Sequence, residues 1–406
     1  MSTNPTASPD FVAGRRPLTF RRAAAISILC GASAAVVLGY AFTKPLLDFQ
    51  VYWTAPHLFV SGHNPYSFDD VFATQKALGS MAPIPIMFLC PPWVLSLLAP
   101  LGFVRSYVLG WFLWFVTLTV SVAIGSKFLM DIYFGDLEIP EISAPRSYRY
   151  LFAFTFYPTL YALKCTQLSP LVFLGVAGFL RFEARGRKTI AGLFLCLTLL
   201  KPHLLLLLWL ALLLERRWNS LITSSFITAV LSGIAVLRFP SAFREYWNLM
   251  NGPYPRFIAS GLFGGLRMIL ATPTSYWIQF VTIPIGVLWL ILYWHRRTTW
   301  IWADEVPVLV TASLLCTPYG FAHDLTLLMV PIIYVSAKLA RQAGRIPGKW
   351  VLFYTVVNFS VLAILFKSDQ WAFVPAPIAV AIAIWHMTKH GSLYAIDVHG
   401  GGTASA

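Results

Sequence analysis

A carboxylate at the start of the first long loop is the first residue whose type and position could do chemistry. Asp48 stands in the run LLDFQVYW, shortly after the apolar segment 23–42. A carboxylate held at the mouth of an apolar cavity binds its proton more tightly than in water, which suits a general base acting on a hydroxyl group. A carboxylate that caps a helix or pairs with Lys44 at the membrane interface explains the same position without catalysis. Both interpretations stay open at this point.

Lys201 and His203 bring basic groups into one of the most apolar stretches of the chain, LTLLKPHLLLLL. An isolated charge in such surroundings is costly unless it meets an anion or water. The pair therefore predicts a clamp for a phosphate, with His203 assisting Lys201, and snorkelling of the lysine to the interface is the alternative. Arg267, in ASGLFGGLRMIL, is a second candidate for phosphate, with an ordinary interfacial arginine as its alternative.

Two further turns place polar residues between apolar segments. TPYGFAHDLTLL, residues 317–328, contains a Pro-Tyr-Gly turn followed by His323 and Asp324. His323 is a candidate for contact with a phosphate or a sugar, and Asp324 either contacts the substrate or caps the following helix. Gln167, in FYPTLYALKCTQLSP, is a candidate for substrate contact with the same ambiguity.

The loop after Asp48 supplies the remaining candidates. Its run SGHNPYSFDD has an Asn-Pro turn signal at Asn64, followed by Tyr66, and residues 68–78 predict a short amphipathic helix on the membrane surface. Tyr52, Asn64 and Tyr66 are candidates for sugar contact, although aromatic residues at a membrane interface usually belong to its aromatic belt. Asp69-Asp70 is interpreted as the start of a helix, and no metal or other cofactor is assigned.

Composition places the chain in a membrane. Of the 406 residues, 58% are hydrophobic and only 11% are charged, whereas about a quarter of the residues in a soluble domain are charged. The net charge of +14 would favour nucleic acid in a soluble protein. No stretch resembles a nucleic-acid module, and basic residues beside apolar segments follow the bias of short cytoplasmic loops. The five cysteines stand singly among apolar residues and predict buried free thiols.

Thirteen apolar segments are candidates for crossing the bilayer. They lie near residues 23–42, 86–103, 107–126, 148–164, 168–182, 188–200, 202–214, 219–237, 275–294, 306–320, 325–339, 350–366 and 371–388. Basic clusters such as RFEARGRK and KLARQAGRIPGK mark the cytoplasmic side. Because Asp48 and Gln167 both face outward in this scheme, one of the three segments between them does not fully span. The sequence therefore predicts an all-α polytopic membrane protein with about twelve transmembrane helices.

The predicted organisation is one integral-membrane domain at residues 23–388 with outer loops at 43–85 and 238–274. Residues 1–22 predict a disordered cytoplasmic leader, and residues 389–406 a flexible cytoplasmic tail. The segment 23–42 is long enough to span, which favours a retained first helix over a signal peptide. The segments on either side of Lys201 are too short for two upright spans and predict a hairpin with its tip in a cavity below the outer surface.

Transport is the main competing class, because many spans and a lipid-facing cavity also suit a transporter or flippase. A coupled transporter usually keeps ionisable groups near the bilayer midplane or shows two matching halves, and neither is evident here. A polysaccharide polymerase or ligase that uses lipid-linked sugars is a third reading. The four arginines of loop 238–274 would suit it.

The order of these features resembles the family-87 glycosyltransferases (DUF2029). The matching features are Asp48-Phe49 with Tyr52, Gly62-x-Asn64-Pro65-Tyr66, Pro91-Pro92, Pro100-Leu101, Gln167, Ala191-Gly192, Lys201-Pro202, Pro318 and His323-Asp324. The resemblance runs from about residue 45 to residue 340. Two places depart from the family: Cys165-Thr166-Gln167 stands where Gly-Gln is frequent, and Cys90-Pro91-Pro92 where Tyr-Pro-Pro is usual.

The resemblance implies a GT-C helical bundle and an activity. The family includes the polyprenol-phosphate-mannose-dependent α-1,2-mannosyltransferase of phosphatidylinositol mannoside synthesis. The resemblance implies transfer of a hexose from a polyprenyl-phosphate sugar to a hydroxyl group of a lipid or glycan acceptor on the outer face of the plasma membrane. Mannose is the leading candidate for the hexose. Asp48 stands at the position of the family's general base for an inverting displacement. Charge and sidedness assign Lys201, Arg267 and His323 to the leaving phosphate.

Overall fold

The computed structural model describes residues 47–135, 151–252, 261–263, 273–343, 346–365 and 373–388. All of the secondary-structure elements in these ranges are helices, sixteen α-helices and four 3₁₀ helices, so the predicted all-α class is confirmed. The predicted leader, the first apolar segment 23–42 and the C-terminal tail lie outside the described residues. The same holds for Arg267.

The helices follow one another with short connections. In chain order they are α2 (Leu47–Ser61), α3 (Phe68–Ala77), α4 (Pro92–Gly102), α5 (Tyr107–Tyr133), α6 (Leu151–Thr155), α7 (Tyr157–Lys164), α8 (Ser169–Glu183), α9 (Lys188–Leu195), η3 (Cys196–Leu200), η4 (Pro202–Leu205), α10 (Leu206–Leu214), α11 (Trp218–Arg238), α12 (Ala242–Asn251), η6 (Pro273–Phe280), α14 (Thr282–His295), α15 (Trp302–Cys316), η7 (Ala322–Leu328), α16 (Met329–Ala343), α17 (Gly348–Leu365) and α19 (Pro375–Thr388).

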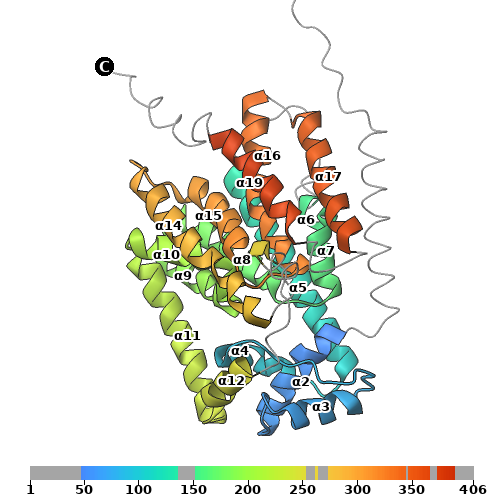
Figure 1. Ribbon diagram of the computed structural model, residues 1–406. Coiled ribbons are helices and arrows are strands. Elements are labelled where there is room, and N and C mark those ends of the chain that lie inside the picture. Colours follow the sequence, from blue (N-terminus) through green and yellow to red (C-terminus); the bar gives the residue numbers. More distant parts are fainter. Residues whose placement is uncertain are drawn as a thin grey trace, which may run out of the picture.

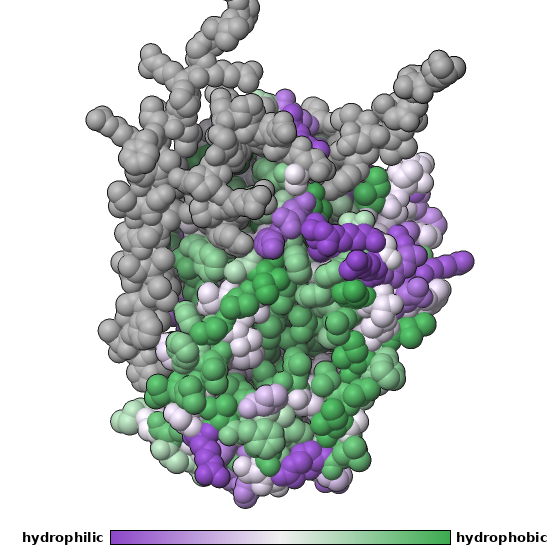
Figure 2. Space-filling model, turned by 180° about the vertical axis from the view of Figure 1, so that it is seen from behind, coloured by the Kyte–Doolittle hydropathy of each residue, from purple (hydrophilic) through white to green (hydrophobic). Residues whose placement is uncertain are grey.

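Four helical stretches in the described residues are long and apolar enough to cross a membrane. They are Tyr107–Tyr133, Trp218–Arg238, Trp277–His295 and Ala322–Ala343. Five shorter apolar helices of 10–17 residues accompany them. Figure 2 shows hydrophobic residues across the middle of one face, with hydrophilic residues above and below them. These features are those of an integral multi-pass membrane protein. The four helical stretches support that class, and the predicted number of about twelve transmembrane helices stays a prediction.

The three segments between Asp48 and Gln167 fold differently from one another. Segment 107–126 lies within the 27-residue helix α5. Segment 86–103 contributes only the 11 residues of α4, which begin at a proline pair. Segment 148–164 contributes α6 and α7, of 5 and 8 residues, which are separated at Phe156. Of these three segments, α5 alone has the length of a full span.

The loop predicted at 43–85 carries two helices at one end of the molecule. There, α2 and α3 lie together with α4 and α12 (Figure 1). The predicted surface helix is confirmed as α3: the Ser67 side chain accepts a hydrogen bond from the Asp70 amide, and Asp69 and Asp70 occupy the first turn. The negative charges of both side chains interact favourably with the positive end of the helix dipole. Phe49, Tyr52 and Trp53 of α2 are buried, which makes α2 a core helix.

Gly102 allows α4 to pack closely against α2. A Cβ atom at Gly102 would lie 2.6 Å from the carbonyl carbon of Pro56 and 3.0 Å from the amide nitrogen of His57. Backbone atoms cannot move aside as a flexible side chain can. The crossing of α2 and α4 therefore requires glycine at this position.

Gly102→Ala should lower the stability of the protein, by about 1–3 kcal/mol, because the added methyl group forces α2 and α4 apart. Gly233 in α11 is the matched control, since a Cβ atom there meets nothing within 4 Å. Gly233→Ala should leave the stability unchanged or raise it by up to about 1 kcal/mol. Thermal unfolding of the detergent-purified variants measures both effects. Equal midpoints for the two variants would contradict the proposed packing.

Candidate active site

The hairpin predicted around Lys201 has two short arms that meet at that residue. The helix α9–η3 ends at Leu200, and η4–α10 begins at Pro202. Proline lacks an amide hydrogen and keeps the preceding residue out of the helical region, so the helix breaks at Lys201, with φ −138° and ψ 71°. Only 9% of Lys201 is exposed. The break thus directs the Lys201 side chain into the interior of the helical bundle.

The Lys201 ammonium group is the centre of a buried polar network. Its Nζ atom donates to Asp324 Oδ1 at 2.7 Å and to Ser169 Oγ at 3.3 Å. It also lies 3.2 Å from His323 Nε2 and 3.5 Å from Gln167 Oε1. Because an ammonium group can only donate, His323 Nε2 accepts this hydrogen bond and the imidazole is neutral. A buried ammonium requires such partners to offset the loss of its hydration.

Asp324 balances the charge of Lys201 and also holds its own backbone turn. Its Oδ1 atom accepts from Ser169 Oγ at 2.6 Å, and its Oδ2 atom accepts from the Phe321 amide at 3.1 Å. Asp324 therefore stabilises the start of η7, as one of the two interpretations of the sequence predicted, and it also pairs with Lys201, while its contact with substrate stays a prediction. With 1% exposure, Asp324 forms a desolvated ion pair with Lys201.

Gln167 joins this network to α2. The Tyr52 hydroxyl donates to Gln167 Oε1 at 2.7 Å, so the same oxygen lies near both Tyr52 and Lys201. The turn that carries Gln167 places Thr166 at φ 51°, in the left-handed region that favours glycine. This is the position at which the chain departs from the frequent Gly-Gln pattern. The Trp114 indole donates to the Thr166 carbonyl at 2.9 Å and holds the turn in place.

Two histidines lie at the edge of the network. His323 is stacked on the ring of Phe321 at 5.3 Å between centroids, and its ring also lies 6.4 Å from that of Tyr161. His203 meets the ring of Tyr319 edge-on at 6.2 Å. The stacking fixes the orientation of His323 toward Lys201.

An aromatic wall connects the network to the end of the molecule formed by α2, α3, α4 and α12. Phe88 packs between Tyr52 and Tyr66, and Tyr66 packs on Tyr246 of α12. The Tyr66 hydroxyl donates to the Cys90 carbonyl at 3.1 Å. Burial raises the pKa of the Cys90 thiol to about 12, against the opposing effect of Lys201, and burial raises the pKa of Tyr246 to about 12. These groups are neutral hydrogen-bonding and packing groups at pH 7.

The structure brings together five of the residues that the sequence predicted. Tyr52, Gln167, Lys201, His323 and Asp324 form one connected set. His203 and Tyr66 lie around this set, as described above.

Of the remaining predicted residues, Asn64 stands apart from the set. The Asn64 side chain accepts from the Tyr66 amide at 2.9 Å, so it stabilises a turn. Asp48 belongs to α2, but its side chain lies outside the described residues, as does the whole of Arg267.

Ser169 is the network residue that the sequence analysis missed. It is fully buried and contacts both charged partners of the ion pair. Its only signal in the sequence is the Ser-Pro start of α8, which is frequent at any helix N-terminus. Nothing in that pattern distinguishes a helix start from a contact with a charged pair.

Comparison with known proteins then decides the class. The model of glycosyltransferase family 87 matches residues 88–318. The chain belongs to glycosyltransferase family 87. It is therefore a glycosyltransferase, rather than the transporter or flippase that the sequence alone left open, and it acts on a sugar donor and an acceptor. No curated protein and no solved structure matches the chain.

The matched residues cover only part of the network. This family-87 member has Gln167, Ser169, Lys201 and His203 inside residues 88–318. The pair His323-Asp324 follows the matched range, and Asp48 precedes it. The ion pair of Lys201 with Asp324 thus joins the family region to the helix that comes directly after it.

Proposed function

We propose that this family-87 enzyme transfers a hexose from a polyprenyl-phosphate sugar to a hydroxyl group of a lipid or glycan acceptor on the outer face of the plasma membrane. Mannose is the leading candidate for the hexose. The observation that carries the proposal is the buried network of Lys201, Asp324, His323, Ser169 and Gln167 in a chain that belongs to a glycosyltransferase family. Polar groups of this kind suit a sugar phosphate and are costly elsewhere in a membrane bundle.

A lipid-linked donor follows from where the basic residues lie. One arginine pair, Arg216-Arg217, stands directly before the start of α11, and another, Arg296-Arg297, stands directly after the end of α14; we assign that end of the molecule to the cytoplasm. The aromatic wall beside the network then faces the outer side, where nucleotide sugars are absent. A sugar carried across the membrane on a polyprenyl phosphate supplies the activated donor there.

The proposed reaction is a single inverting displacement. Asp48 takes the proton of the acceptor hydroxyl as its oxygen forms a bond with the anomeric carbon. The bond from that carbon to the phosphate oxygen breaks, and the electron pair leaves with the polyprenyl phosphate. A β-linked donor then yields an α-linked product. The helical register supports this role for Asp48, which stands one turn before Tyr52 in α2, the residue that contacts the network through Gln167.

The charged groups of the network have separate roles in the proposal. Lys201 and Arg267 offset the negative charge that grows on the leaving phosphate, and the neutral His323 side chain contributes a polar contact to it. Asp324 and Ser169 hold the Lys201 ammonium in place, which makes them positioning residues. Gln167, Tyr52 and the groups around them contact sugar hydroxyls. Because Asp324 already balances Lys201, the arrangement stays close to neutral between turnovers.

The donor class is tested with the full-length protein in vesicles and a panel of labelled donors. We expect transfer from polyprenyl-phosphate-mannose to a lipid or glycan acceptor, no transfer from GDP-mannose, and a product that an α-mannosidase cleaves. Transfer from GDP-mannose without polyprenyl phosphate would overturn the donor class. Transfer from another polyprenyl-phosphate hexose alone would leave the mechanism in place and change the sugar.

A further inference from the structure

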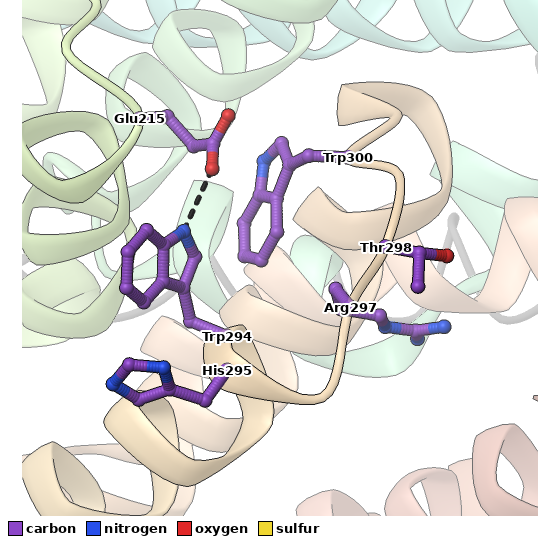
Figure 3. A pocket seen from close by; sticks show the side chains of 6 residues that line it. All are labelled: Glu215, Trp294, His295, Arg297, Thr298 and Trp300. Carbon is purple, nitrogen blue, oxygen red and sulfur yellow. Dashed lines mark hydrogen bonds between the residues drawn. The ribbon is translucent and has the colours of Figure 1, made fainter.

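A second polar site lies far along the chain from the Lys201 network, where α10 ends and the turn from α14 to α15 passes. A pocket of about 320 Å³ opens there (Figure 3). It is lined by Glu215, Trp294, His295, Arg297, Thr298 and Trp300. Its size is at the lower end of the range for small-molecule sites. The proposed sugar transfer uses none of these residues.

The pocket places a carboxylate against two indole rings. Glu215 Oε1 accepts from Trp294 Nε1 at 2.7 Å. Figure 3 shows the Glu215 carboxylate turned toward this indole, with the ring of Trp300 on its other side. The Nε1 atom of Trp300 is buried and has no hydrogen-bond partner among the described residues. A carboxylate and two indole rings line this one pocket, and both kinds of group favour a cation, because the carboxylate is negative and indole ring faces are electron-rich.

The charges around the pocket also favour a cation next to Glu215. Arg297 lines the pocket, but its guanidinium group points away from the indoles in Figure 3. It forms an ion pair with Glu305, with Arg297 Nε 3.3 Å from Glu305 Oε1, and it donates a hydrogen bond to the Tyr293 hydroxyl. Among the described residues, Glu215 has no basic side chain as an ion-pair partner. Its negative charge is therefore available to a bound ammonium group.

The pocket also lies at the edge of the apolar surface. Leu288 and Leu292 of α14 and Leu213 of α10 are 60%, 50% and 47% exposed, which suits contact with acyl chains. Arg216 and Arg296 are exposed beside the pocket residues Glu215 and Arg297. A carboxylate and two indoles next to exposed arginines and an apolar surface match the ammonium, phosphate and acyl chains of one zwitterionic phospholipid.

We propose that this pocket binds the ammonium head group of a zwitterionic phospholipid in the leaflet opposite the active site. The ammonium group lies between Trp294 and Trp300 and pairs with Glu215, the phosphate lies against Arg216 or Arg296, and the acyl chains follow α14. The pocket is independent of the sugar-transfer proposal, because it shares no residue with the Lys201 network, and only the choice of leaflet rests on that proposal.

Lipid retention tests the site directly. The full-length protein is purified from micelles that contain equal amounts of phosphatidylethanolamine and phosphatidylglycerol, and the lipid that stays bound is counted by native mass spectrometry. We expect wild type to prefer phosphatidylethanolamine by about tenfold, the ratio that corresponds to about 1.4 kcal/mol. Glu215→Gln should abolish the preference while keeping an acceptor for the Trp294 indole. Trp300→Phe should reduce it by weakening the cation–π contact.

Glu245→Gln is the matched control, because it makes the same chemical change in α12, where Glu245 pairs with Arg244. It should retain the wild-type preference. Equal retention of the two lipids by wild type, or an unchanged preference in Glu215→Gln, would overturn the proposal. Displacement of the lipid by equimolar glycerophosphoethanolamine, which has no acyl chains, would show a site for soluble amines and would also overturn it.

Discussion

Asp48→Asn is expected to lower kcat for sugar transfer by a factor of about 10²–10⁴, the usual contribution of a positioned general base. Asparagine has nearly the same shape as aspartate but cannot take the proton of the acceptor hydroxyl. Because the proton is removed only as the new bond forms, the KM for the donor should change little. The initial rate of transfer from polyprenyl-phosphate-mannose, per amount of folded protein, measures the effect.

Asp69→Asn is the control for this substitution. Asp69 is exposed in the first turn of α3, and its replacement makes the same chemical change in the same segment of the chain. It should keep wild-type activity. If Asp48→Asn keeps it as well, Asp48 has a structural role at the start of α2, and the general base must be sought elsewhere.

Removing either partner of the ion pair between Lys201 and Asp324 is the second large expected effect. Lys201→Met leaves a buried carboxylate without its cation, and Asp324→Leu leaves a buried ammonium without its anion. Loss of one partner of a buried pair costs about 3–5 kcal/mol. Each single variant should therefore unfold at a temperature several degrees lower than wild type and should transfer no measurable sugar.

The double variant Lys201→Met with Asp324→Leu separates the two consequences. Replacing both charges by apolar groups removes the uncompensated charge, so its thermal midpoint should recover toward that of wild type. Its transferase activity should not recover, because the cation for the leaving phosphate is gone. Recovery of activity would show that the pair serves the fold alone. Lys188→Met, at the exposed start of α9, controls for the loss of a lysine.

Much of the helical framework could be predicted from the sequence, because its causes are local. The low fraction of charged residues selects a membrane bundle, since each buried charge is costly in lipid. A serine before two aspartates starts α3, and Pro202 breaks the helix at Lys201. The number of full spans was harder to predict, because prolines shorten apolar segments such as 148–164 into helices that hydropathy alone counts as spans.

The order of motifs also predicted the family, and it named most of the residues that meet in the network. What it could not predict is which of them pair. Lys201 and Asp324 are 123 residues apart, and their contact exists because η7 packs against α8 and α7 beside the hairpin tip. Ser169 joins them for the same reason, although its own sequence context is that of an ordinary helix start.

The sequence by itself determined the kind of protein: an all-helical membrane protein with basic and polar residues at fixed places along its chain. Only the tertiary structure decided that Lys201 is neutralised by Asp324, and that the Glu215 carboxylate accepts a hydrogen bond from the Trp294 indole. The physical reason is the same in both cases. Helix formation and burial depend on neighbours along the chain, whereas the environment of a charge depends on side chains that packing brings from distant helices.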